Sequence, residues 1–99
     1  RFATAPEPES RFDFIAAGDF DGRDFIVDLR AAKEAPLADP SAVRAQVSDI
    51  GAQGPMPDAT QRAVLCCASG LRAWQAADRL ADVWSGRIVL AALGKEIVN

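Results

Sequence analysis

The chain has 99 residues, 49% of them hydrophobic, and carries a formal net charge of −3. This size fits one domain with one core, and the scattered basic residues argue against a nucleic-acid partner. No apolar run approaches the roughly 20 residues that a membrane span needs, so no membrane partner is expected. With no histidine and only two cysteines, the chain lacks the usual zinc ligand sets, and neither a metal nor another cofactor is expected.

The first residues in chain order read as a linker. Residues 1–10 hold two prolines, two glutamates and few apolar side chains, a composition typical of a segment outside a packed core. We therefore expect residues 1–11 to be a linker or N-terminal extension. Residues 12–99 are expected to form a single domain.

The middle of the chain reads as short strands separated by turns. Residues 25–29 are rich in β-forming side chains and precede a helix-favouring segment at 31–35, which predicts a strand and then a helical turn. Residues 43–50 fit either a strand or a helix. We expect a strand near 43–46, followed by a helical turn. Residues 51–60 contain two glycines and two prolines and read as a surface loop.

The last third of the chain predicts strand, helix and strand. Residues 62–67 are almost wholly apolar, as expected of a strand buried on both faces of a sheet. An amphipathic pattern runs from residue 71 to a stop signal at Gly86, and residues 87–90 read as another strand. Strands alternating with helices predict an α/β fold in three layers, with a mostly parallel central sheet flanked by helices. The apolar side of the helix, interpreted as packing, holds Leu71, Trp74, Ala77, Leu80, Ala81 and Trp84.

The junction between the strand at 62–67 and the following helix is the most informative feature. The strand ends on Cys67, and a six-residue loop then closes on Arg72. Ligands of parallel sheets bind beyond the carboxyl ends of the strands, where Cys67 falls. Amides at the start of a helix, together with the helix dipole, stabilise a thiolate. We therefore expect an anion cradle around a nucleophile. Cys67 and Arg72 are the expected catalytic residues, and the loop that binds the anion is built from Ala68, Ser69, Gly70 and Leu71.

The two cysteines are adjacent, which has consequences for both. A vicinal disulfide is strained, so Cys66 and Cys67 are expected to be free thiols, and free thiols favour a cytoplasmic location. Neighbouring residues of a strand point to opposite faces of the sheet. Cys66 is therefore expected in the core rather than beside Cys67 as a resolving thiol.

The segment at 25–30, Glu34, and the loop pattern Cys-x-Ser-Gly-x-Arg from Cys67 to Arg72 resemble the rhodanese-homology domain. The resemblance covers roughly residues 24–94, and it implies a rhodanese-like fold and a sulfurtransferase. It implies that Cys67 carries a persulfide sulfur, surrounded by the loop amides.

The same resemblance assigns supporting residues and partners. Asp28 and Arg30 match a structural Asp-x-Arg at the end of an earlier strand. The implied sulfur donor is thiosulfate or a persulfidated protein, and the implied acceptor is a thiol, cyanide or a sulfur-carrier protein. Residues 36–50 lack the histidine-containing segment usual in the family, and this divergence is similar to the domain appended to sulfur-carrier-activating adenylyltransferases. Fusion to such a domain is a further expectation.

Two alternative functions stay open. Counted from Cys67, the spacing Cys-x4-Arg is typical of sulfur transfer, whereas Cys-x5-Arg counted from Cys66 is typical of cysteine phosphatases. We favour Cys67, and a phosphatase using Cys66 or Cys67 is the weaker alternative. The other alternative is a catalytically idle docking or regulatory module, because Ala68 and Leu71 replace basic residues that thiosulfate-using members often carry.

Overall fold

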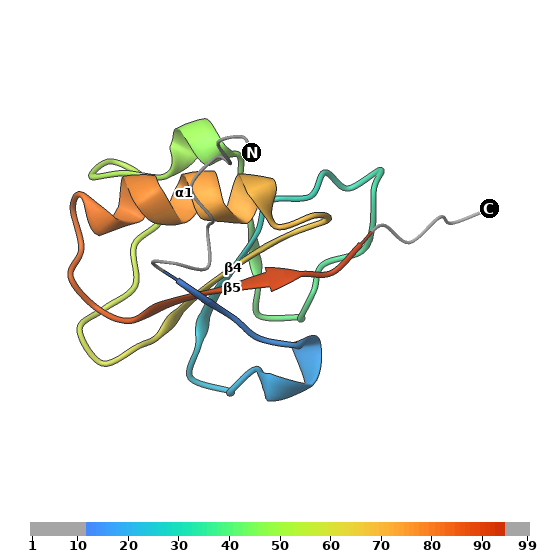
Figure 1. Cartoon of the computed structure of the whole chain (residues 1–99), viewed down its shortest axis with the longest axis horizontal. Coiled ribbons are helices and arrows are strands. Elements are labelled where there is room, and N and C mark those ends of the chain that lie inside the picture. Colours follow the sequence, from blue (N-terminus) through green and yellow to red (C-terminus); the bar gives the residue numbers. More distant parts are fainter. Residues whose placement is uncertain (1–11, 95–99) are drawn as a thin grey trace, which may run out of the picture.

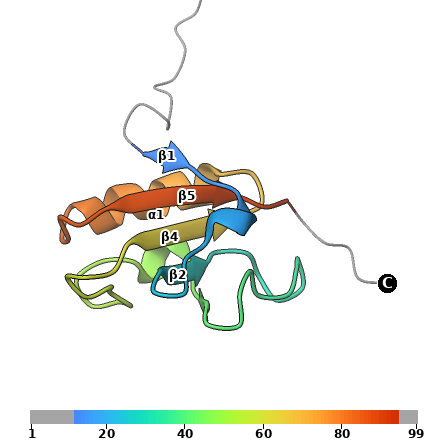
Figure 2. The same ribbon diagram turned by 90° about the horizontal axis from the view of Figure 1, so that it is seen from below.

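The computed structural model describes residues 12–94, and the linker predicted at residues 1–11 lies outside them. Within this range the chain forms one sheet of five strands in the order β1-β5-β4-β2-β3 (Figures 1 and 2). All four strand pairings are parallel, which confirms the predicted α/β class. The strands are β1 (Asp13–Phe14), β2 (Phe25–Asp28), β3 (Val43–Arg44), β4 (Ala63–Cys67) and β5 (Ile88–Ala92).

Strand β4 lies at the centre of the sheet because its side chains are apolar on both faces. All five of its residues are buried, and it pairs with β2 on one side and β5 on the other. The register places Cys66 opposite Asp28 of β2, and Cys67 opposite Ala92 of β5. The carboxyl ends of the three strands therefore meet at one edge of the sheet, around Cys67.

One face of the sheet is covered by the helix α1 (Leu71–Ala81) and the 3-10 turn η3 (Val47–Asp49) (Figure 1). Small side chains on the buried side of α1 let the helix pack closely against β4 and β5. Leu71, expected on this apolar side, is 58% exposed because it begins the helix at the tip of the preceding loop. The buried residues of α1 are Ala73, Ala76, Ala77 and Leu80.

The opposite face is covered without an α-helix in the part of the chain that the structure describes. Its buried residues come from β2, β4 and β5, including Ile26 and Val64, and from Ala42 just before β3, and loop residues such as Phe20 and Ala38 pack over them. The 3-10 turn η2 (Ala17–Asp19) lies on this side (Figure 1). The sheet is thus flanked by an α-helix on one face only within residues 12–94, which differs from the expected helices on both faces.

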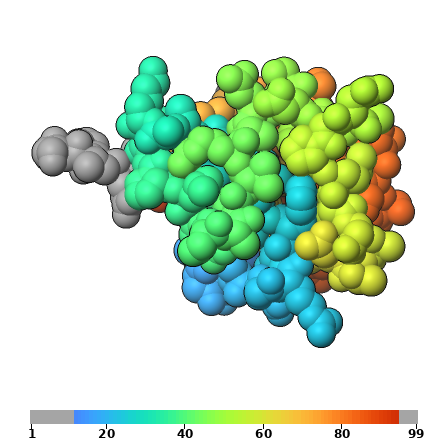
Figure 3. Space-filling view, turned by 180° about the vertical axis from the view of Figure 1, so that it is seen from behind, coloured from blue at the N-terminus to red at the C-terminus, as the bar shows by residue number. Residues whose placement is uncertain are grey.

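The remaining elements follow the sequence-based expectations with shifted ends. The strand predicted at 43–46 is shorter, and the helical turn expected after it is η3. The helix ends at Ala81, and two further amides, of Val83 and Trp84, still donate to the Leu80 carbonyl. Strand β1 was not predicted. Figure 3 shows the molecule from behind the view of Figure 1. This face is formed mainly by the first two thirds of the described chain, and α1 is visible only at the edge of the view.

Packing of α1 on the sheet predicts which helix residues matter for stability. Leu80 is 1% exposed within the core, whereas Val83, just after the helix, is 44% exposed. Leu80→Ala should lower the free energy of unfolding by about 2–5 kcal/mol, and Val83→Ala should change it by less than about 0.5 kcal/mol. Urea denaturation measures both, and equal losses would contradict this packing.

Candidate active site

Cys67 lies at the end of β4, with its side chain on the face covered by α1. Its Sγ accepts two backbone hydrogen bonds, from the amide of Gly70 at 3.0 Å and from that of Ala73 at 3.2 Å. The first amides of a helix have no partner within the helix and carry the positive end of its dipole. Both contacts therefore direct N–H donors at this sulfur, the arrangement by which a helix start holds an anion. In the described structure the residue is fully buried, with 0% exposure.

The start of the loop is held in place by the segment that follows β5. Beyond β5, the amides of Leu93 and Gly94 donate to the carbonyls of Cys67 and Ala68 at 2.8 Å each. Within residues 12–94, no hydrogen-bond acceptor is found for the amides of Ala68, Ser69 and Arg72. The loop thus has three further amide donors for an anion, in addition to the two that already bind Sγ.

Gly70 makes the turn between strand and helix possible. Its φ of 98° lies in the left-handed region, which residues with a side chain rarely adopt. A Cβ atom at this position would also lie 2.9 Å from Cε2 of Phe14 on β1. The edge strand β1 therefore packs closely against the loop, and any side chain here would disturb both.

Cys66 occupies a different environment from Cys67. It lies in the hydrophobic cluster on the opposite face of the sheet, as predicted from the alternation of side chains. Burial raises the pKa of the Cys66 thiol to about 12, the negative charge of Asp28 acts in the same direction, and Arg30 opposes it only in part. Cys66 is therefore an uncharged core thiol at neutral pH.

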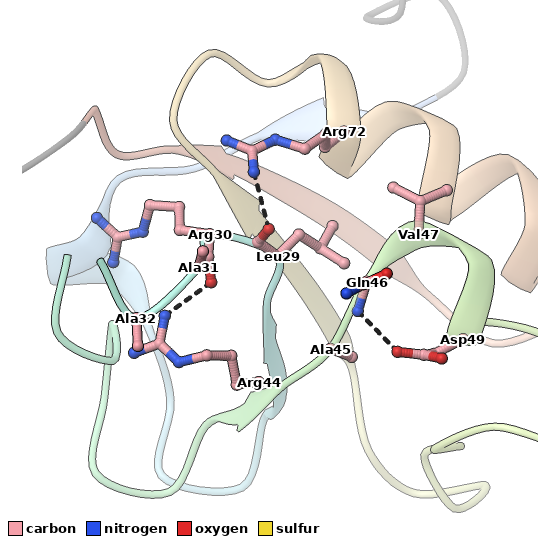
Figure 4. A pocket seen from close by; sticks show the side chains of 10 residues that line it. All are labelled: Leu29, Arg30, Ala31, Ala32, Arg44, Ala45, Gln46, Val47, Asp49 and Arg72. Atoms are coloured by element: carbon pink, nitrogen blue, oxygen red, sulfur yellow. Dashed lines mark hydrogen bonds between the residues drawn. The ribbon is translucent and has the colours of Figure 1, made fainter. Parts of the chain in front are cut away.

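The guanidinium of Arg72 is bound by other groups of the protein. NH1 and NH2 donate to the two carboxylate oxygens of Glu34 at 2.9 and 3.0 Å. NH1 also donates to the Leu29 carbonyl at 3.0 Å, as Figure 4 shows. The bond to Glu34 raises the pKa of Arg72, with burial opposing. Arg72 thus begins the helix beside the thiol, while its charge is paired with a carboxylate.

Asp28 and Arg30 form a buried pair at the end of β2. Nε and NH2 of Arg30 donate to the two carboxylate oxygens at 3.0 and 2.9 Å. Arg30 also donates to the carbonyls of Gly94 and Pro36, and the Ala38 amide donates to Asp28. The pair therefore ties the segment at 36–38 and the end of β5 to β2, at the same edge of the sheet as the loop.

The charge of this pair depends on pH. Burial by itself would raise the pKa of Asp28, but hydrogen bonds from Arg30 and Ala38 outweigh it and leave the pKa below its ordinary value. A carboxylate whose pKa is lowered by folding stabilises the fold above its unfolded pKa of about 4. This stabilisation is lost as the pH falls through the folded pKa.

A cavity of about 650 Å³ lies beyond the ends of β2 and β3 (Figure 4). Arg72 borders it on one side and Arg44 on another, and its walls include the side chains of Leu29 and Val47. Arg44 donates to the carbonyls of Arg30 at 2.7 Å and Ala35 at 3.1 Å. Sequence reasoning missed Arg44, because a lone arginine in a two-residue strand carries no motif.

Residues 12–94 lack two features that would indicate another type of site. No group of three or more potential metal-binding side chains is found there. No helix in the same range has the length and apolar character needed to cross a bilayer.

Comparisons with known proteins were made at three levels. Neither the protein-family models, nor the curated proteins, nor the solved structures give a match. The function must therefore be inferred from the chemistry of the site, because a fold alone does not specify a function.

The conformation of Gly70 predicts a position-specific loss of stability. Gly70→Ala should lower the free energy of unfolding by about 1–3 kcal/mol, because alanine is strained in this backbone conformation and its Cβ meets Phe14. Gly22→Ala is the matched control, since a Cβ there meets no atom within 4 Å. Thermal or urea unfolding measures both variants. An unchanged stability of Gly70→Ala would contradict the described loop.

Proposed function

We propose that this domain is a rhodanese-like sulfurtransferase that carries sulfane sulfur as a persulfide on Cys67. The observation that carries the proposal is the pair of hydrogen bonds from the amides of Gly70 and Ala73 to Sγ, at 3.0 and 3.2 Å. These donors favour a thiolate without any histidine. The resemblance of the loop pattern to rhodanese-homology domains supports the same assignment.

The two half-reactions need only a thiolate and local stabilisation of charge. The Cys67 thiolate attacks the outer sulfur of a donor, a new S–S bond forms on Sγ, and the donor's S–S bond breaks. With thiosulfate the leaving group is sulfite, and with a persulfide it is a thiolate. An acceptor thiolate or cyanide then attacks the outer sulfur of the persulfide and restores the Cys67 thiolate. The amides of Ala68, Ser69 and Arg72, which have no acceptor within residues 12–94, would stabilise the bound charge.

The phosphatase alternative has less support. Cys66, which has the phosphatase spacing to Arg72, lies in the core on the other face of the sheet. Arg72, which would bind the phosphate, is paired with Glu34. Cys67 lies at the start of the loop, where a nucleophile is expected, but the loop from Cys67 to Arg72 is one residue shorter than the phosphatase spacing.

The partners and location are proposed on the same basis. A thiol that must stay reduced between turnovers fits a cytoplasmic location. With Arg72 paired, the loop offers no free cationic side chain, so a protein persulfide is a better donor than free thiosulfate. A sulfur-carrier protein activated by a fused adenylyltransferase is the proposed acceptor system.

One observation favours a second candidate, the catalytically idle docking or regulatory module. Cys67 has 0% exposure, and a donor must reach its sulfur for any transfer. If the loop at 68–71 does not open, the thiol serves only to order the turn between β4 and α1. Sulfur loading distinguishes this candidate from the enzyme.

The test is sulfur loading measured by intact mass. The domain is incubated with thiosulfate, or with a persulfidated cysteine desulfurase, and the gain of one sulfur atom is recorded. We expect an adduct with at least the protein donor, its loss in Cys67→Ala, and its retention in Cys66→Ala, the matched control. No Cys67-dependent adduct with either donor, in a folded protein, would reject the enzyme and leave the idle module. Hydrolysis of an aryl phosphate would instead support the phosphatase.

A further inference from the structure

Glu34 binds the guanidinium of Arg72, which is the cationic group that an anionic substrate would need. Its two carboxylate oxygens accept from NH1 and NH2 of Arg72 at 2.9 and 3.0 Å, in a two-pronged arrangement. This fork of donors is the feature by which arginine recognises oxyanions such as carboxylate and phosphate. NH1 of Arg72 also donates to the Leu29 carbonyl. A small oxyanion can bind Arg72 only by competing with Glu34.

Glu34 is also held firmly in place. Its Oε1 accepts from the Ala31 amide at 2.7 Å, and its side chain is only 14% exposed. The amide of Glu34 donates to the Ala31 carbonyl at 2.8 Å. The turn at 31–34 therefore fixes both the backbone and the carboxylate of Glu34. Because the carboxylate is already positioned, its bonds to Arg72 are formed with little loss of side-chain freedom.

The other cations near the cavity do not replace Arg72. Arg30 is paired with Asp28, and Arg44 donates to two backbone carbonyls. The cavity is lined by Leu29, Ala45 and Val47 as well as by these arginines. Its size, about 650 Å³, and these apolar walls suit the organic body of a substrate better than a bare dianion.

We propose that Glu34 is a specificity-determining residue that disfavours small dianionic donors such as thiosulfate and leaves organic persulfides, R–S–SH, as the donor class. This inference rests on the proposed function of Cys67. The thiosulfate dianion would meet a carboxylate where it needs a cation. An organic persulfide carries at most one charge on its sulfur and does not need the arginine fork. Its body would lie in the cavity beside Arg72.

In the transfer step with this donor, one S–S bond forms and one S–S bond breaks. The Cys67 thiolate attacks the terminal sulfur of R–S–SH, the Sγ–S bond forms and the donor S–S bond breaks. The electron pair of the broken bond leaves with R–S⁻, and the proton is shared between this thiolate and the new persulfide according to pH. No external oxidant or reductant is needed, because the sulfane sulfur keeps its oxidation state.

The test compares two donors and three proteins. Second-order rates of sulfur loading on Cys67 are measured by quenched intact mass with thiosulfate and with cysteine persulfide. Glu34→Gln keeps an oxygen for the Ala31 amide but removes the charge facing Arg72. Asp82→Asn, at the exposed end of α1, makes the same change in net charge far from the loop.

The wild-type protein should load faster with cysteine persulfide than with thiosulfate at equal concentrations. Glu34→Gln should raise the ratio of the thiosulfate rate to the persulfide rate by about tenfold or more, and Asp82→Asn should leave this ratio within about twofold of wild type.

Each contrary outcome has a separate meaning. A wild-type protein that loads equally well with thiosulfate, or an unchanged ratio in folded Glu34→Gln, overturns the role of Glu34 while Cys67 remains a sulfur carrier. Failure of every donor to load the wild type rejects the proposed function itself. If Glu34→Gln does not fold, the proposal is still overturned by a wild-type protein that loads with thiosulfate as fast as with cysteine persulfide.

Discussion

The sulfur of Cys67 accepts hydrogen bonds from the amides of Gly70 and Ala73, and these two bonds couple the central strand to the first turn of the helix. Strand β4 can hold the sulfur there because it is paired on both sides and buried on both faces. Gly70 allows the chain to reverse within the loop without a clash with Phe14. The same turn that completes the fold thus places amide donors around a thiol.

The three arginines that line the cavity are all bound by other groups of the protein. Arg30 is neutralised by Asp28, and Arg72 by Glu34. Arg44 is satisfied by two backbone carbonyls. Backbone dipoles, rather than a free arginine, therefore provide the remaining attraction for negative charge. This balance is consistent with a site that takes sulfur from a bulky or weakly charged donor.

The parts of the fold that the sequence predicts well are those with a clear hydrophobic pattern. β2 and β4 are short runs of consecutive buried residues, and α1 has one buried side with helical spacing. The opposite orientations of the two cysteines follow from strand geometry alone. Strand β1 is two residues long, with both residues partly or largely exposed, so it has no pattern to detect.

Other features depend on tertiary structure and could not be predicted. The amphipathic pattern of α1 continues past Ala81, so the sequence predicts a helix that ends near Gly86 rather than at Ala81, where it does end. The loop motif indicates that Arg72 begins the helix, but not which group its guanidinium binds. Its partner Glu34 lies 38 residues away in sequence, and only the packing of β2 against β4 brings the two together. Coverage of one face by loops likewise depends on long-range packing.

Backbone amide NMR spectra of the reduced and sulfur-loaded domain test most directly whether Cys67 is the sulfur carrier. We predict that the amide signals of Gly70 and Ala73 change most when Cys67 gains a sulfur, because their acceptor atom changes. Cys67→Ala should shift the same two signals in the unloaded protein. If the largest changes instead lie around Cys66, or if these two amides do not respond to the state of Cys67, then Cys67 is not the sulfur carrier.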